Sequence, residues 1–259
     1  MFLFSSLLDL IERLYVGYKN AKYKLLGIQL TQEQKDFLNR FFPYYAGLST
    51  DHQKEFEERV FFFLEDKKFI PRGNLKEVPP KVKLLIAATA VKVSFGFRDF
   101  RFEHFNKILV YPDSYYSTIN QQYHFGEVNP KLGIIVLSML NFLEGVGDPL
   151  SGRNLGIHEI AHALKLENQI HYNKGSVVFN PTRWRQYAEH ANLAIEKISK
   201  GELSIFRAYA GTNKHEFFAV ALELFFEKSA ELKAYNPELY QALVYLLKQD
   251  PMVLLKKKD

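Results

Sequence analysis

The spacing of apolar side chains predicts helices towards both ends of the chain. Thr31 is followed three residues later by Gln34 and then by an apolar run, which is typical of a helix that begins with a capping box. Ser49 and Thr50 precede a second amphipathic segment, and residues 81–95 (KVKLLIAATAVKVSF) are apolar enough to form a buried helix. The same periodicity predicts three helices near the C-terminus, over residues 181–199, 214–230 and 236–249.

The middle of the chain follows a different pattern. Residues 107–117 (KILVYPDSYYS) and 131–140 (KLGIIVLSML) are rich in β-branched and aromatic side chains and predict two strands. The polar residues 120–131 between them predict a turn region, and the Pro- and Gly-containing residues 70–80 and 145–154 predict connecting loops. We therefore expect an α+β fold that is mostly helical, with a small sheet.

We expect this fold to form one domain over residues 1–259. Residues 31–100 would be its helical N-terminal part, and residues 100–259 would be the core that carries the chemistry. Residues 1–30 would be an N-terminal extension whose pattern predicts an amphipathic helix.

The N-terminal extension opens with an apolar cluster, MFLFSSLL. Asp9, Glu12 and Arg13 interrupt it within the length that a bilayer requires, and it has neither the basic start nor the small-residue cleavage site of a signal peptide. We expect this helix to pack on the domain of a cytoplasmic protein. Contact with a membrane surface through its apolar side chains is the alternative.

Composition narrows the chemistry that is open to the chain. Hydrophobic residues make up 47% and charged residues 24%, which is typical of a soluble globular protein. There is no cysteine, so disulfides and thiolate metal sites are excluded, and any metal must be held by nitrogen and oxygen atoms. The net charge of +5 comes from scattered lysines without a nucleic-acid-binding motif, so we expect no direct nucleic-acid partner.

The motif HEIAH is the strongest chemical signal. His158 and His162 are four residues apart, so on a helix both rings project from one face and can present nitrogen atoms to one zinc ion. Glu159 can reach a water molecule on that ion and take its proton, because a bound zinc lowers the pKa of the water towards about 7. This arrangement predicts a metal-dependent hydrolase.

The alternative is a motif that arose by chance on a solvent-exposed helix. Against it, apolar residues surround the three polar ones, which predicts a largely buried helix. These apolar residues are Leu155, Ile157, Ile160, Ala161 and Leu164. Buried histidines need partners, and a metal ion would satisfy both rings.

A catalytic zinc site needs a third protein ligand. Lys165 and Asn168 occupy the positions at which an extended HExxH motif would place a glycine and a third histidine, so the ligand must come from elsewhere. The candidates downstream are His171, Glu189, His190, His215, Glu216 and Glu223.

The segment 209–228 is the best candidate to supply the third metal ligand. Asn213 can cap a helix in which Glu216, Glu223 and Glu227 share one stripe. His215 points to another side of this helix and is a weaker candidate. The residues alone leave two interpretations of the stripe open, a metal ligand with its neighbours or a solvent-facing acidic face.

Several stretches in the same order resemble the Mlc titration factor A family of bacterial zinc-dependent peptidases. They are GDPLSGRNLGIHEIAHAL, YAGTNKHEFFAVALELFFE and NPELYQALVYLLKQDP, and the likeness extends upstream to FEERVFFFLEDKKF, LLIAATAVKVSFGF and ILVYPDSY. The resemblance covers residues 40–252. It implies a zincin-like metalloprotease fold with a small sheet beside the HExxH helix, and it implies kinship with the lethal-factor-like gluzincins.

The resemblance also implies roles for single residues. Glu216, which opens the EFFA run, would be the third ligand of Zn²⁺ beside His158 and His162. Tyr209, seven residues before it, would stabilise the oxyanion of the tetrahedral intermediate, with Glu159 as the catalytic base. Val220 stands where such relatives often carry an acid that orients a histidine.

Two further features follow from this departure and from the implied fold. Glu223 or Asn154 would take over the orienting role that Val220 cannot fill. Residues 133–139 would be the edge strand along the cleft that pairs with substrate, and an interior strand is the alternative reading of this apolar stretch.

The sequence therefore predicts a zinc metallopeptidase that cleaves peptide or amide bonds as an aminopeptidase or a restricted endopeptidase. Its partners would be a peptide or protein substrate and, by the resemblance, a DNA-binding repressor of the Mlc type that regulates sugar uptake. The alternative function is a regulatory repressor-binding protein with little or no catalysis.

Overall fold

The computed structural model describes residues 29–98, 100–117, 121–173 and 178–255. The predicted N-terminal amphipathic helix lies outside these residues. Within them the chain has an α+β fold that is mostly helical, as predicted. None of the helices in these ranges is long and apolar enough to cross a membrane.

The helices lie close to the predicted segments, and the differences have local causes. Pro43 has no N–H to continue the first predicted helix and instead begins a new one. The predicted helix 214–230 ends at Glu227, and the apolar residues 139–147, which were not predicted as a helix, form one. The helices are α2 (Gln32–Phe41), α3 (Pro43–Gly47), α4 (Thr50–Asp66), α5 (Pro80–Ser94), α6 (Met139–Gly147), α7 (Leu155–Asn173), α8 (Pro181–Ser199), the 3-10 helix η1 (Ala208–Gly211), α9 (Lys214–Glu227), α10 (Ser229–Tyr235), α11 (Pro237–Leu247) and α12 (Pro251–Leu254).

Helix starts were the most predictable local feature. Thr31 and Gln34 form the predicted capping box, in which each side chain accepts a hydrogen bond from the backbone N–H of the other residue. Ser49 caps α4, and Asn213 caps α9 by accepting from the N–H groups of His215 and Glu216. Such caps are worth about 1 kcal/mol each and fix the register of the first turn.

Four strands form the main sheet, in the order β1 (Lys68–Pro71), β2 (Lys107–Tyr111), β6 (Ile134–Ser138) and β5 (Gly126–Asn129). The first three run parallel, and β5 pairs antiparallel with β6 at one edge. The strand β6 is therefore interior, and the prediction that residues 133–139 form the edge strand is wrong. The edge is β5, which lies within the predicted turn region.

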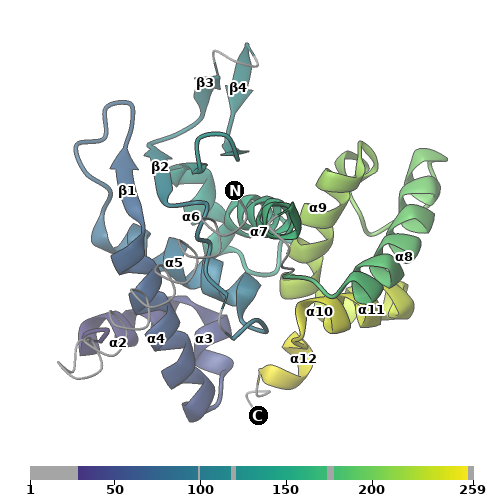
Figure 1. The fold of residues 1–259 in the computed structure, drawn as a ribbon, viewed down its shortest axis with the longest axis horizontal. Coiled ribbons are helices and arrows are strands. Elements are labelled where there is room, and N and C mark those ends of the chain that lie inside the picture. Colours follow the sequence, from purple (N-terminus) through teal and green to yellow (C-terminus); the bar gives the residue numbers. More distant parts are fainter. Residues whose placement is uncertain (1–28, 99, 118–120, 174–177, 256–259) are drawn as a thin grey trace, which may run out of the picture.

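A two-stranded hairpin, β3 (Tyr115–Ser117) with β4 (Gln122–His124), projects beyond the main sheet (Figure 1). The turn region 120–131 was not predicted as strands because its side chains are mostly polar, so it carries no hydrophobic alternation. The missed strand β1 is only four residues long and ends at a proline.

Helix α7 runs through the middle of the molecule, between the sheet with α4 and α5 and the bundle formed by α8, α9 and α11 (Figure 1). It packs against α5, α6 and α9 and against the strands β5 and β6. The buried hydrophobic residues form one continuous cluster that includes Phe56 and Phe217, which have no exposed surface. Burying such a side chain contributes roughly 1.5–3 kcal/mol, so this core fixes α7 rigidly in place.

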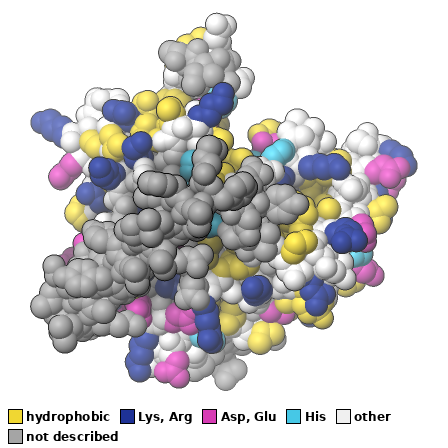
Figure 2. Space-filling view, viewed as in Figure 1, with side chains coloured by type: hydrophobic (Ala, Val, Ile, Leu, Met, Phe, Trp, Pro, Cys, Tyr) yellow, Lys and Arg dark blue, Asp and Glu magenta, His cyan; other side chains and the backbone are white. Residues whose placement is uncertain are grey.

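The surface carries charges of both signs. Among the described residues in the view of Figure 2, Lys and Arg side chains are spread over the face, with acidic and apolar side chains between them. This distribution agrees with the scattered lysines of the sequence.

Candidate metal centre

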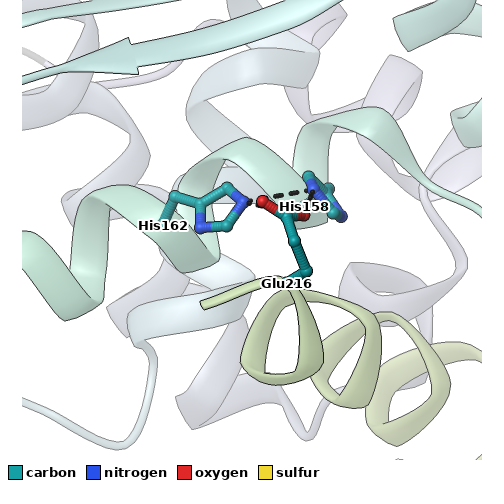
Figure 3. A group of neighbouring side chains, drawn as sticks. All are labelled: His158, His162 and Glu216. Carbon is teal, nitrogen blue, oxygen red and sulfur yellow. Dashed lines mark hydrogen bonds and ion pairs between the residues drawn. The ribbon is translucent and has the colours of Figure 1, made fainter. Parts of the chain in front are cut away.

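Two turns of α7 bring the histidines of the HEIAH motif together. Asn154 precedes the helix, and its side-chain oxygen accepts a hydrogen bond from the N–H of Ile157, which fixes the first turn. His158 and His162 lie one turn apart with ring centroids separated by 4.7 Å, and their Nε2 atoms are 3.2 Å apart. Both rings point to the side on which α9 lies (Figure 3).

The first turn of α9 supplies a carboxylate to the same point. The Asn213 cap sets the register of this helix, so the side chain of Glu216 projects towards α7 (Figure 3). Its Oε2 atom lies 3.1 Å from Nε2 of His158 and 3.5 Å from Nε2 of His162. One potential ligand atom from each of the three side chains lies within 4.8 Å of the other two. Among the described residues, His158, His162 and Glu216 are the group of side chains found close enough together to hold a metal ion.

The donor set fits a cation. The two facing Nε2 atoms can share at most one proton between them, whereas a divalent metal ion would accept a lone pair from each ring and from the carboxylate. Two imidazole nitrogens and one carboxylate oxygen are the ligand types that zinc takes in catalytic sites, where a fourth position stays open. The residues present therefore fit a metal ion.

In the absence of a metal ion, the carboxylates around His158 attract a positive charge to this point. Burial lowers the pKa of His158, but the carboxylates of Glu216 and Glu223 outweigh it and raise the pKa to about 9. Burial raises the pKa of Glu216, and its hydrogen bonds to the two histidines outweigh that effect and hold the pKa far below its usual range. Glu216 is therefore ionised at neutral pH, as a metal ligand must be.

Glu223 lies behind His158, on the next turns of α9. Its Oε1 atom is 2.8 Å from Nδ1 of His158, and the Arg207 guanidinium donates to both carboxylate oxygens, over 2.6 and 3.0 Å. The backbone N–H of Asn154 also donates to it, over 2.8 Å. Four contacts from three residues fix this carboxylate and compensate for its almost complete burial.

One turn further along α9, Glu227 holds the loop that leads into α7. It accepts hydrogen bonds from the N–H of Gly152 and from the side chain of Asn154, over 3.0 and 2.8 Å. Glu223 and Glu227 are both buried, so the reading of this acidic stripe as a solvent-facing one is wrong. The two carboxylates tie α9 to the start of α7 and fix the distance between the three converging side chains.

Glu159 lies at the floor of a cleft of about 800 Å³ that His158, Tyr209 and the strand β5 also line. It is 5% exposed, and burial together with the negative charges of Glu216 and Glu127 raises its pKa to about 7, against the lowering effect of His158. A carboxylate with this pKa can take up and release a proton near neutral pH.

Gly126 of β5 lies directly against this carboxylate. A Cβ atom at position 126 would overlap the side chain of Glu159, so only glycine allows the edge strand to approach so closely. The backbone of β5 therefore forms one wall of the cleft beside the buried acid.

Tyr209, on η1, also lines the cleft. Its ring centroid is 6.2 Å from that of His158, and the side chain is half-exposed. Burial of the hydroxyl and the charge of Glu216 raise its pKa to about 12, so it stays protonated and can donate a hydrogen bond into the cleft.

The structure separates the other predicted ligands from this point. His171 lies near the C-terminal end of α7 beside Glu167, at 3.8 Å. His190 and Glu189 line a polar groove between α8 and α11, and His215 is exposed on α9. Of the six candidates, Glu216 joins the histidine pair and Glu223 contacts His158 from behind.

Two residues of the cleft were not singled out from the sequence. Gly126 carried a usable signal, because a glycine within an extended segment often marks a close approach of two chain segments. Arg207 carried none, since it precedes η1 in an irregular segment and only the fold brings it to Glu223.

Comparison with known proteins places these residues in a wider context. Residues 18–247 match the family model described as glucose-regulated metallo-peptidase M90. The chain is 26% identical over 231 residues to an uncharacterized protein of Synechocystis sp., with 82% of each chain covered. It is 29% identical over 233 residues to proteins named Mlc titration factor A from Yersinia pestis and Yersinia pseudotuberculosis, with 83% of this chain and 84% of each relative covered.

Proposed function

The chain belongs to the glucose-regulated metallo-peptidase M90 family, and on that premise we propose that it is a zinc-dependent peptidase of the gluzincin type. His158, His162 and Glu216 would hold the zinc ion. The observation that carries the proposal is the convergence of the Glu216 carboxylate with both imidazoles beside an open cleft. Zinc would suit this donor set, because catalytic zinc sites combine histidine nitrogen and carboxylate oxygen ligands.

A zinc ion held there supplies Lewis acidity, which lowers the pKa of a water molecule and polarises the substrate carbonyl. Glu159 would accept a proton from the attacking water and later deliver it to the leaving amine. Its position supports this role, since Glu159 lies beside the proposed ligand His158 and lines the cleft that a substrate would enter.

Tyr209 would donate its hydroxyl proton in a hydrogen bond to the oxyanion of the tetrahedral intermediate. Removal of one donor of this kind typically costs about 10²–10³ in kcat. The side chain is half-exposed and lines the cleft, which supports a contact between its hydroxyl and a bound substrate.

The free edge of β5 would bind the substrate backbone. The Ser138 N–H donates a hydrogen bond to the carbonyl of Phe125, so the backbone groups of Phe125 face β6. In an antiparallel pair the residues of a strand face the partner strand alternately, so the backbone N–H and C=O groups of Gly126 and Val128 point away from β6. An extended peptide that adds to this edge would pass beside Glu159, which lies against Gly126. A sheet with an antiparallel edge beside the HExxH helix supports a zincin-like fold.

Metal analysis together with peptide cleavage tests this function. We expect about one zinc per chain, cleavage of peptide or amide substrates in a panel that covers aminopeptidase and endopeptidase types, and loss of both on chelation with recovery on adding zinc. Replacement of Glu216 by Gln should weaken zinc binding, whereas replacement of the exposed Glu196 on α8 by Gln should change nothing. Purified protein that binds no zinc at this site would contradict the proposal.

A repressor-binding role is a second candidate, supported by the name of the Yersinia relatives, Mlc titration factor A. The chain would bind a DNA-binding repressor of the Mlc type, with or without catalysis. Binding of such a purified repressor by the Glu159→Gln variant would separate the two functions, because this substitution removes the catalytic base and leaves the protein surface almost unchanged. Failure of both the native chain and the variant to bind would exclude this role.

A further inference from the structure

A second cavity lies against the loop that leads into α7, and none of the three converging side chains of the metal centre lines it. Its volume is about 570 Å³, within the range of small-molecule sites. Most of its wall is apolar and comes from segments far apart in the sequence, including Phe42, Val146, Leu150, Phe226 and Met252. Asn154 lines both this cavity and the cleft, so the loop 148–154 separates the two.

Lys92 of α5 reaches this cavity and is the unusual feature of its wall. The side chain is 8% exposed, yet its ammonium makes no hydrogen bond and has no carboxylate oxygen within 4.0 Å among the described residues. Its contacts are the faces of Phe42, Tyr44 and Phe226, at 5.4 to 5.9 Å from the ring centroids. Three aromatic faces stabilise a cation but do not accept the three N–H bonds that an ammonium offers.

Glu227 also lines the cavity, but it does not neutralise this ammonium. Its two oxygens already accept hydrogen bonds from Gly152 and Asn154, and it makes no ion pair with Lys92. Burial lowers the pKa of Lys92 to about 8, against the raising effect of Glu227, so most molecules carry the charge at neutral pH. The ammonium opens onto the cavity and has no protein acceptor among the described residues, so a ligand carboxylate in the cavity would supply one.

We propose that this cavity, here called the Lys92 cavity, binds an amphipathic monocarboxylate. The carboxylate of the ligand would accept hydrogen bonds from the Lys92 ammonium. Its apolar body would lie against Phe42, Phe226 and the loop residues Val146 and Leu150. Leu150 and Met252 are exposed, 73% and 42%, so an apolar tail can enter between them.

Octanoate is a suitable probe, with octanol and acetate as controls. Titration calorimetry with the full chain should show one octanoate bound per chain. Acetate has the charge without the tail, and octanol has the tail without the charge, so each should bind at least about tenfold more weakly than octanoate. Equal affinity for octanol and octanoate would overturn the proposal.

Two substitutions locate the bound probe. Lys92→Met keeps the approximate length of the side chain and removes the ammonium. It should weaken octanoate binding about tenfold or more and leave octanol binding unchanged. Lys81→Met is the matched control, since Lys81 is an exposed lysine on the same helix, and it should have no effect. Ala230→Trp should block the cavity, because Ala230 is exposed and lines it, so a large ring can enter without disturbing the core.

The same variants exclude binding elsewhere. Octanoate bound at the metal centre would be insensitive to both Lys92→Met and Ala230→Trp, and that result would overturn the proposal. So would the absence of octanoate binding to the native chain. The proposal does not rest on peptidase activity, and each of these measurements can be made with protein that cleaves no substrate.

Discussion

Oε1 of Glu223 lies 2.8 Å from Nδ1 of His158, while Nε2 of the same ring faces Glu216. A carboxylate at Nδ1 keeps a proton on that nitrogen, so Nε2 presents its lone pair when a metal ion is bound. Arg207 and the backbone of Asn154 hold the carboxylate in turn. The orientation of the proposed metal ligand is thus set by residues that do not contact the metal.

Replacement of Glu223 by Gln should therefore weaken zinc binding. An amide keeps the size of the side chain but removes the charge that pairs with Arg207 and His158. Loss of a carboxylate behind a ligating histidine typically costs 10- to 100-fold in metal affinity or activity, and we expect about this effect. Competition with a chromophoric chelator measures it, with circular dichroism as a control for folding. Zinc affinity equal to that of the native chain would show that Glu223 does not position His158.

Glu159→Gln should separate catalysis from metal binding. The amide cannot accept the proton of the attacking water, so we expect kcat to fall by about 10²–10⁴. Zinc content should stay the same, because Glu159 lies on the same helix as the ligands but its carboxylate is not among the three converging groups. Steady-state kinetics and metal analysis on the same preparation test both halves of this expectation. A variant with native kcat would remove Glu159 from the mechanism.

Tyr209→Phe should lower kcat more than it changes KM. The ring keeps its place beside His158, and only the hydroxyl that would donate to the oxyanion is lost. We expect a decrease in kcat of about 10²–10³-fold. Tyr209 is half-exposed, so the free energy of unfolding should change by less than about 0.5 kcal/mol. A large rise in KM at constant kcat would instead indicate a role in holding the substrate before reaction.

Much of this site could be predicted from the sequence because the features that indicate it lie within single helices. The i, i+4 spacing of His158 and His162 and the Asn213 cap are properties of single helices, and both give the predicted local geometry. The convergence of Glu216 on the histidines is a tertiary relationship. It was expected only through the resemblance to a family, because the residues alone allowed a solvent-facing stripe equally well.

The order of strands in the sheet could not be predicted from the hydrophobic pattern. Strand β6 is buried on both faces, so its continuous apolar run says nothing about whether it is an edge or an interior strand. The true edge, β5, has the sequence GEVN, which has little hydrophobic alternation because one side of it faces the cleft. Its pairing with β6 and the contact of Gly126 with Glu159 depend on the packing of α7 against the sheet.

Gly126→Ala should disturb both activity and stability. The added methyl group would overlap the Glu159 side chain, which is buried and cannot move away freely. Overpacking of this kind typically costs about 1–3 kcal/mol in the free energy of unfolding, and the displaced carboxylate should reduce kcat. Gly147→Ala at the end of α6 is the matched control, since nothing lies within 4 Å of its added methyl group. Denaturant titrations of the two variants compare them directly, and equal stability would contradict the close packing of β5 on α7.

Lys92→Met should stabilise the protein in a pH-dependent way. The pKa of Lys92 falls from 10.5 to about 8 in the folded chain, so between these values the unfolded chain binds more protons and the stability of the native protein rises with pH. Below pH 8 both states carry the charge, and burial of the ammonium then costs on the order of 3 kcal/mol. The methionine variant lacks this cost, so its advantage should be largest at pH 7 and should shrink as the pH rises from 8 to 10.5. Urea titrations of both proteins across this range, in the presence of chelator to keep the metal centre in one state, measure the difference. An advantage that stays constant with pH would mean that the ammonium is not buried as the structure has it.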